Sequence, residues 1–229
     1  MLGEGKKISR WKEMESFPNV IEPKFYDVFE KDHPYKGNWR QEVFKNSNPI
    51  VLELGCGRGE YSVGLGQHYP DKNFIGLDIK GARIWKGAKQ ALDQNLRNIF
   101  FIRTHIDLIT SFFAPNEVDE IWITFPDPQP QKTRARKRLT APMFIDRYKK
   151  LLKPNGIIHL KTDNEGFFRY TLEEIERNNF NLIEHTFNLY NEDLKNLDSK
   201  TQDILSIKTY YENLFSQKGH KIHYLKFTF

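Results

Sequence analysis

The sequence has 229 residues, of which 38% are hydrophobic, and this is enough for one core of ordinary size. It has no apolar run near the roughly 18 residues of a membrane span, and its single cysteine excludes an internal disulfide. The formal net charge of +5 is uneven, because nine Lys or Arg between Gln129 and Lys153 stand against Asp146 alone. That segment carries +8 and the remainder −3. We expect a cytoplasmic protein, apart from membranes, with a basic segment suited to a polyanion.

Residues 1–48 differ in composition from the rest of the chain. They contain eight aromatic residues and nearly balanced charge, and three prolines interrupt any long helix. We predict an N-terminal extension of short elements, only partly ordered, ahead of a domain that spans residues 49–229.

From residue 49 onward, strand patterns alternate with helix patterns. Helical patterns run to about residue 69 and over 82–95, 142–152 and 165–178. Seven segments have the length and apolar content of strands: 49–54, 73–79, 99–103, 118–124, 157–162, 181–187 and 222–229. This alternation predicts an α/β fold with a doubly wound, mostly parallel seven-stranded sheet. Ligands of such folds bind beyond the carboxyl ends of the strands.

The first strand runs into a glycine turn, with Gly55, Gly57 and Gly59 in G-x-G-x-G spacing. Glycine lets the backbone turn tightly and lets a ligand approach the main chain. Glu53 stands two residues before the turn, and Asp78 closes the second strand, where a carboxylate can accept hydrogen bonds from ribose hydroxyls. A plain strand-to-helix turn is the simplest alternative. The combination favours S-adenosylmethionine over a dinucleotide, since its ammonium and sulfonium suit an acidic wall, and it is typical of a class I methyltransferase.

Asp107 follows the third strand, where class I methyltransferases usually contact the adenine. An N-cap for a short helix at Leu108 is a competing interpretation of Asp107. We interpret Cys56 as a small packing residue inside the turn. The seven histidines show none of the spacings typical of a metal site, so we expect no metal.

Asp127 comes directly after the fourth strand, between Pro126 and Pro128. The prolines restrict its backbone, as suits a carboxylate that must be held still. The run Lys132–Arg138 then places five cations within seven residues. Methyltransferases that act on exocyclic amines often carry (D/N)-P-P-(aromatic) at this point, but the aromatic residue is missing here. The alternative for the basic run is a solvated surface.

These motifs together resemble the bacterial tRNA (guanine-N7)-methyltransferase family over roughly residues 49–229. The resemblance rests on F-P-D-P followed by a further proline and the basic run, on the three acids of the first half, and on two later motifs. Those motifs are Thr-Asp at 162–163 and Lys-Thr-Tyr-Tyr-Glu at 208–212.

The resemblance implies methyl transfer from S-adenosylmethionine to N7 of the variable-loop guanosine, position 46 in tRNA numbering. It assigns the cofactor to Glu53, Asp78, Asp107 and Asp127, and it makes Asp127 catalytic as well. It assigns the tRNA to Gln131, Lys132, Arg134, Arg136, Lys137, Arg138, Asp163, Thr209, Tyr210, Tyr211 and Glu212. The chain departs from the family at Gln129, where Trp is usual, and at Gln131, where a substrate-contacting Lys is usual. The neighbouring Lys132 can supply that contact.

The sequence leaves several alternatives open. Asp163 suits an N-cap, and Thr209 with Glu212 suits a capping box. A methyltransferase for another RNA site or a small molecule explains the glycine turn but leaves the +8 segment unused. A non-catalytic RNA-binding protein explains the basic run but not the acids and glycines at their spacing. We expect a monomer or a homodimer.

Overall fold

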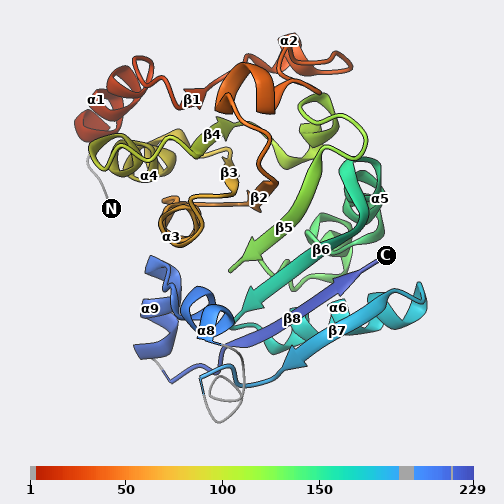
Figure 1. Ribbon diagram of the computed structural model, residues 1–229. Coiled ribbons are helices and arrows are strands. Elements are labelled where there is room, and N and C mark those ends of the chain that lie inside the picture. The colour runs from red at the N-terminus through yellow and green to blue at the C-terminus, as the bar shows by residue number, and fades with distance from the viewer. Residues whose placement is uncertain (1–3, 191–198, 218) are drawn as a thin grey trace. The chain divides into compact units, whose positions relative to one another are not determined.

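A computed structural model of the chain describes residues 4–190, 199–217 and 219–229 (Figure 1). The chain forms two compact units, Met1–Phe113 and Ala114–Phe229. Each unit contributes four strands, and most pairs of neighbouring strands are parallel. The α/β fold with a mostly parallel sheet is therefore confirmed. The strand beyond the predicted seven is a two-residue pairing near the N-terminus. Within the described ranges, no helix is long and apolar enough to cross a membrane.

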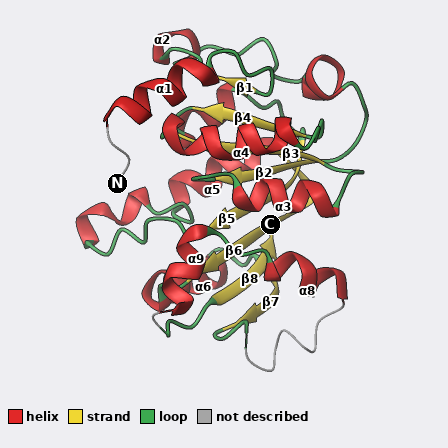
Figure 2. Cartoon of the chain, turned by 90° about the vertical axis from the view of Figure 1, so that its left-hand side faces the viewer, coloured by secondary structure: helices red, strands yellow, loops and turns green. Residues whose placement is uncertain are grey.

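Unit 1 has the strand order β1-β4-β3-β2, with all three pairs parallel. Three apolar runs form its strands β2, β3 and β4, and these runs are buried along almost their whole length. Helices α3 and α4 pack on β3 and β4 (Figure 2). The elements in chain order are α1 (Glu4–Met14), β1 (Val20–Ile21), α2 (Phe25–Val28), the π-helix η1 (Trp39–Phe44), β2 (Ile50–Leu54), α3 (Glu60–His68), β3 (Asn73–Asp78), α4 (Gly81–Asp93), β4 (Ile99–Arg103) and the 3-10 helix η2 (Ile106–Ser111).

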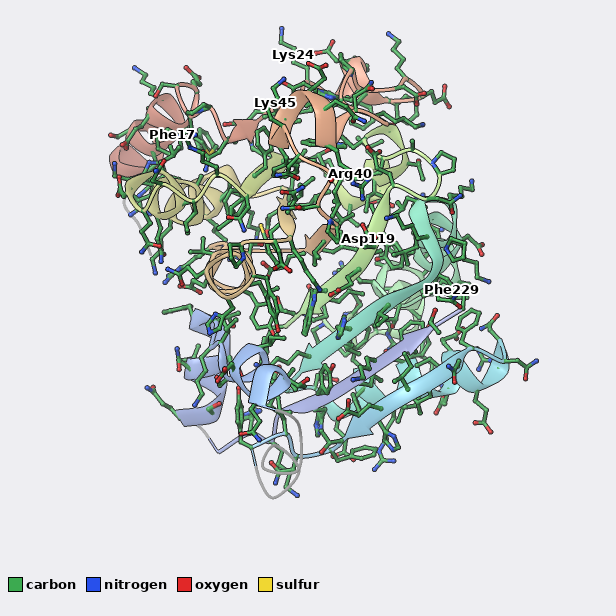
Figure 3. All side chains as sticks on the ribbon, in the orientation of Figure 1. Phe17, Lys24, Arg40, Lys45, Asp119 and Phe229 are labelled. Carbon is green, nitrogen blue, oxygen red and sulfur yellow. The ribbon has the colours of Figure 1, made fainter. Side chains whose placement is uncertain are left out.

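The extension before β2 is part of unit 1, and buried and half-buried contacts join it to the rest of that unit. The indole N–H of Trp85 on α4 donates to Oε2 of Glu13 on α1 at 2.8 Å. The indole N–H of Trp39 donates to the carbonyl of Phe112 at 2.7 Å, and this indole is completely buried. Lys45 ends η1 in the left-handed conformation and is exposed (Figure 3). Glu13 and Trp39 thus tie the extension to the rest of unit 1 by defined hydrogen bonds.

Unit 2 has the strand order β5-β6-β8-β7, with β5 and β6 parallel and the other pairs antiparallel. The three segments predicted as strands at 118–124, 181–187 and 222–229 are confirmed. Among the described residues, two helices lie between β7 and β8, where no element was predicted. The elements in chain order are β5 (Val118–Thr124), the 3-10 helix η3 (Lys132–Lys137), α5 (Pro142–Leu151), β6 (Leu152–Thr162), α6 (Glu165–Arg177), β7 (Asn181–Thr186), α8 (Ser199–Ser206), α9 (Tyr210–Gln217) and β8 (His223–Thr228).

Strand β6 begins five residues earlier than predicted. Leu152 pairs with Val118, and pairing resumes between Ile157 and Glu120, so a register shift lies between the two contacts. Asn155 has a φ of 63° inside this excursion. These residues form an irregularity within the strand rather than its end, because the chain pairs with β5 on both sides of them.

Candidate functional site

The glycine turn after β2 has the conformation that its sequence predicts. Gly55, Gly57 and Gly59 have φ angles of 74°, 55° and 68°, in the left-handed region that glycine tolerates best. The Asp78 carboxylate holds this turn from the end of the neighbouring strand. Its Oδ2 accepts from the Gly57 N–H at 2.9 Å, and its Oδ1 accepts from the Lys80 N–H at 2.8 Å.

Two glycines of the turn differ in what surrounds them. A Cβ on Gly59 would lie 2.6 Å from Cε1 of Phe101 and 3.1 Å from Cα of Gly87, so this glycine is required by packing. A Cβ on Gly55 would meet no atom within 4 Å. The backbone at Gly55 therefore has open space beside it.

Glu53 is buried directly before the turn, and its Oε2 accepts from the backbone N–H of Ser62 at 2.8 Å and from the Ser62 hydroxyl. Ser62 lies in the first turn of α3, where the helix dipole favours a negative charge. The pKa of the Cys56 thiol is raised by burial first and then by the carboxylates of Glu53 and Asp78. Cys56 is consequently a packing residue with little thiolate character.

Asp107 is exposed in the first turn of η2. The N-cap of η2 is His105, and it makes no side-chain cap. The N-cap interpretation of Asp107 is therefore wrong. Asp78 uses two of the roughly four acceptor directions of a carboxylate on its own turn. The acids and the open glycine backbone of unit 1 fit a ligand that carries hydroxyls and positive charge, as S-adenosylmethionine does.

The loop after β5 is strained on both sides of its carboxylate. Phe125 and Gln129 have φ angles of 48° and 44°, which cost a non-glycine residue about 1 kcal/mol or more each. The Phe125 N–H donates to the carbonyl of Lys161 at 2.8 Å, and Asp127 Oδ1 accepts from the Gln129 N–H at 3.0 Å. Asp127 itself is exposed. The loop thus presents one carboxylate to solvent on a fixed backbone.

The basic run folds as the 3-10 helix η3 and divides into two groups. Four of its cations are exposed: Lys132, Arg134, Arg136 and Lys137. Arg138 is half-buried, and its Nε and Nη2 donate to the Gln129 carbonyl at 3.3 and 3.2 Å. Its guanidinium lies 4.3 Å above the Tyr170 ring. Arg138 therefore braces the loop of Asp127, and the helix that follows begins only at Pro142.

Asp163 is not the N-cap of α6, so that alternative is also wrong. The cap is Asn164, whose Oδ1 accepts from the Phe167 N–H at 2.8 Å. Oδ2 of Asp163 lies 3.5 Å from Nδ1 of His220. The carboxylate of Asp163 is consequently available for a role outside the helix.

Thr209 and Glu212 form half of a capping box. Thr209 Oγ1 accepts from the Glu212 N–H at 3.1 Å, but the Glu212 carboxylate pairs with Lys161 at 2.9 Å. Both members of this ion pair are completely buried. Tyr210 is exposed, and the side chain of Tyr211 lies outside the described residues. Sequence reasoning missed Lys161, although a lysine inside the apolar run of β6 was a visible signal.

Within residues 4–190, 199–217 and 219–229, no group of three or more His, Cys, Asp or Glu is placed to hold a metal ion.

Comparisons with known proteins identify the family of the chain. A family model described as "Putative methyltransferase" matches residues 47–225. The chain is 51% identical over 221 residues to a tRNA (guanine-N(7)-)-methyltransferase of Bacteroides thetaiotaomicron, covering 96% of this chain and 84% of that protein. It is 47% identical over 226 residues to the protein of the same name from Christiangramia forsetii, covering 99% of both chains.

Solved structures agree on the fold. A 16S rRNA methyltransferase, KamB, matches with a TM-score of 0.60 at 13% identity, covering 82% of this chain and 91% of that chain. A second structure, an antibiotic related methyltransferase, matches with a TM-score of 0.62 at 15% identity, covering 88% and 98%. At such identities the likeness concerns the fold, which is of the class I methyltransferase type. With half of its residues shared over nearly its whole length, the chain belongs to the tRNA (guanine-N(7)-)-methyltransferase family.

Proposed function

We propose that the chain transfers a methyl group to N7 of the guanosine at position 46, in the variable loop of tRNA. The observation that carries the proposal is the juxtaposition in unit 2 of an exposed carboxylate on a strained loop with four exposed cations on η3. A relative that is 51% identical carries the name tRNA (guanine-N(7)-)-methyltransferase, which supports N7 of a tRNA guanine as the acceptor. A tRNA substrate fits a cytoplasmic location.

S-adenosylmethionine is the cofactor of this family and supplies a methyl group on a sulfonium. In the proposed function, unit 1 binds it through the open backbone of Gly55 and Gly57. Glu53 compensates the positive charge, and Asp78 accepts hydrogen bonds from the ribose hydroxyls. Asp107 contacts the adenine.

Guanine N7 carries a lone pair and no proton, so the transfer requires no general base beforehand. Catalysis then depends on orientation and electrostatics. Asp127 accepts hydrogen bonds from the N1–H and the amino group of guanine and so fixes the base. Its hydrogen bond from the Gln129 N–H, and the brace that Arg138 makes to the same residue, keep the carboxylate in place. Lys132, or Gln131 beside it, makes the further contact to the substrate.

The exposed cations of η3 hold phosphates on both sides of the target nucleotide. Proteins usually read RNA bases in single-stranded loops, where a base can be splayed out. Phosphate contacts of this kind make affinity fall steeply with salt. Asp163 and the exposed Tyr210 complete the contacts with the substrate.

The test is methylation of unmodified tRNA with labelled S-adenosylmethionine, followed by aniline cleavage, which cuts at 7-methylguanosine. We expect one cleavage site, at position 46, and none in a matched tRNA transcript with adenosine at that position. Asp127→Asn removes a charge without changing the size of the side chain, and we expect it to lower the rate at least a hundredfold. Label without an aniline-sensitive site at position 46, or full activity of Asp127→Asn, would show that the proposal is wrong.

A further inference from the structure

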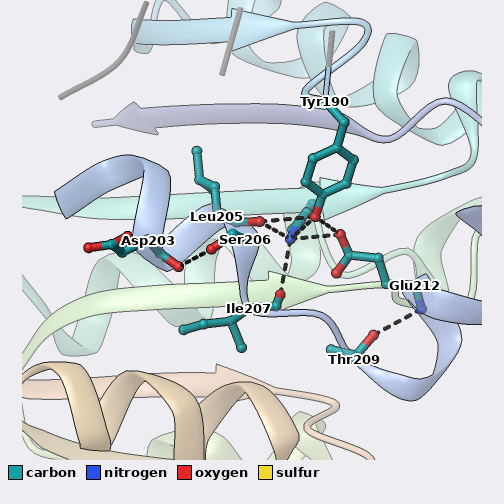
Figure 4. Close-up of polar contacts among 8 residues, drawn as sticks. Tyr190, Asp203, Leu205, Ser206, Ile207, Thr209 and Glu212 are labelled. Carbon is teal, nitrogen blue, oxygen red and sulfur yellow. Dashed lines mark hydrogen bonds and ion pairs between the residues drawn. The ribbon is translucent and has the colours of Figure 1, made fainter. Parts of the chain in front are cut away.

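Lys161 is the penultimate residue of β6 and makes contacts in two directions. Its backbone carbonyl accepts from the Phe125 N–H at 2.8 Å, at the start of the loop that carries Asp127. Its side chain is completely buried, and its ammonium donates to the carbonyl of Leu205 in α8 and to that of Ile207 just after α8. Figure 4 shows these two residues together with Tyr190, Thr209 and Glu212. One residue therefore contacts both the acid loop and the segment that contains Thr209 and Glu212.

The Lys161 ammonium lies among four acceptors from different parts of unit 2. The carbonyls of Leu205 and Ile207 accept at 2.6 and 3.3 Å, the Tyr190 hydroxyl lies at 3.1 Å and Glu212 Oε1 at 2.9 Å. The Leu205 carbonyl belongs to the last turn of α8, where backbone acceptors have no partner within the helix, and the Ile207 carbonyl lies just after that helix. Lys161, on strand β6, thus donates to the last turn of α8 and forms an ion pair with Glu212 of α9.

Glu212 depends on this arrangement. Its N–H is bound by Thr209, and its Oε1 is bound by the Lys161 ammonium and the Tyr190 hydroxyl. Its Oε2 is buried and has no hydrogen-bond partner among the described residues. Without Lys161 the first turn of α9 would contain a buried carboxylate that only one hydroxyl compensates, and such a charge strongly disfavours the conformation that buries it.

We propose that Lys161 is a positioning residue for tRNA, which holds the Thr209–Glu212 segment in a fixed register with the loop of Asp127. The inference rests on the proposed function. Glu212 then acts in the interior of unit 2, as the anchor of the segment, and the exposed Tyr210 is the member that meets the tRNA. The Thr209–Glu212 motif therefore contains both a buried anchor, Glu212, and a residue that contacts the tRNA, Tyr210.

Protonation of Lys161 is required for this role. Burial lowers the pKa of its ammonium from 10.5 to about 8, and the Glu212 carboxylate opposes that fall. The other groups facing the ammonium are Tyr190, whose pKa is raised by burial and by Glu212, and the exposed Lys208, which lies over the Tyr190 ring. Tyr224 is opposite Lys161 on β8, with its pKa raised by burial. With a pKa of about 8, Lys161 changes charge between pH 7 and 9.

The experiment compares the wild type with Lys161→Met, which keeps the length of the side chain and removes the ammonium. Lys226→Met is the matched control, because it removes a half-buried ion pair with Glu184 from the neighbouring strand β8, outside the basic segment. We expect Lys161→Met to raise the KM for tRNA at least tenfold at pH 7 and to leave the Kd for S-adenosylmethionine within twofold. The wild-type KM should rise between pH 7 and 9, whereas that of Lys161→Met should not change. Lys226→Met should behave as the wild type.

Hydrogen exchange of the α9 amides tests the anchor without tRNA. We expect faster exchange at Glu212 and Asn213 in Lys161→Met, and no further increase when Glu212→Gln is added, since the two residues act as a pair. If Lys161→Met does not fold, Lys161→Gln replaces it, because an amide still donates to the carbonyls. A KM within twofold of the wild type in the folded variant, or unchanged exchange in α9, overturns the inference. Absence of tRNA methylation by the wild type refutes the proposed function alone, since the exchange measurement still tests the anchor.

Discussion

Two alanine substitutions in the glycine turn separate ligand binding from packing. Gly55→Ala and Gly59→Ala both place a Cβ on a backbone with a positive φ, of 74° and 68°. A left-handed conformation costs an L-residue roughly 1–2 kcal/mol, and the stiffer unfolded chain returns about 0.5 kcal/mol of this. The conformational penalty is therefore nearly the same at both sites, about 1 kcal/mol.

The surroundings make the difference between the two variants. At Gly59 the new methyl group would lie 2.6 Å from Cε1 of Phe101 and 3.1 Å from Cα of Gly87, and overpacking of this kind costs roughly 1–3 kcal/mol more. At Gly55 it meets no atom within 4 Å. A protein of this size loses roughly 2–4 °C of Tm per kcal/mol. We expect Gly55→Ala to lose about 3 °C and Gly59→Ala about 9 °C.

Binding should follow the opposite order. Isothermal titration with S-adenosylmethionine, at a temperature where both variants are folded, should show at least a tenfold higher Kd for Gly55→Ala. Gly59→Ala should stay within about threefold of the wild type. If Gly55→Ala binds the cofactor normally, the open space at Gly55 is not part of the binding site. Equal Tm values for the two variants would refute the steric argument.

Three further pairs test unit 2. Folded Lys161 loses its proton at pH about 8 and the unfolded chain near 10.5, so the unfolded chain binds more protons in between. The free energy of unfolding should therefore rise by about 2 kcal/mol from pH 8 to 10 in urea titrations, relative to Lys161→Met, and a constant difference would contradict this. Arg136→Ala should weaken tRNA binding and reduce its salt dependence without changing Tm. Arg138→Ala, which breaks two hydrogen bonds, should lower Tm by about 6 °C. Asn164→Ala should lose about 1 kcal/mol of stability in urea titrations as a lost cap, whereas Asp163→Asn should lose tRNA methylation at unchanged stability.

The strands of the sheet were predictable because their apolar runs are continuous. Segments 49–54, 73–79 and 99–103 are buried along almost their whole length, and such runs have few alternatives to a central strand. Helices α8 and α9 were not predicted, because they are only eight residues long and polar. Each is also bound by the Lys161 side chain of β6, a tertiary contact that no local pattern reports.

Some features of the candidate site were likewise predictable from the sequence, and others were not. Motif spacing placed Asp78 and the glycines correctly, since the turn that they form is local to two adjacent strands. The caps could not be assigned from sequence, because Asp163 and Asn164 are adjacent and both are good N-caps. The sequence also could not predict that Arg138 differs from the exposed cations before it. The difference arises from its contacts with the Gln129 carbonyl and the Tyr170 ring. Such choices depend on tertiary contacts.

Burial of the Lys161 charge destabilises the folded chain, even with Glu212 beside it. The fall in the pKa of Lys161 from 10.5 to about 8 corresponds to about 3 kcal/mol at neutral pH relative to an ordinary lysine. Well-packed apolar residues in place of a buried ion pair are often as stable or more stable. Stability alone would therefore not favour a charged pair at this position. A fixed register between the loop of Asp127 and the start of α9 is what an apolar pair would not supply, because apolar contacts lack direction while the ammonium is bound to defined atoms of α8, α9 and Tyr190.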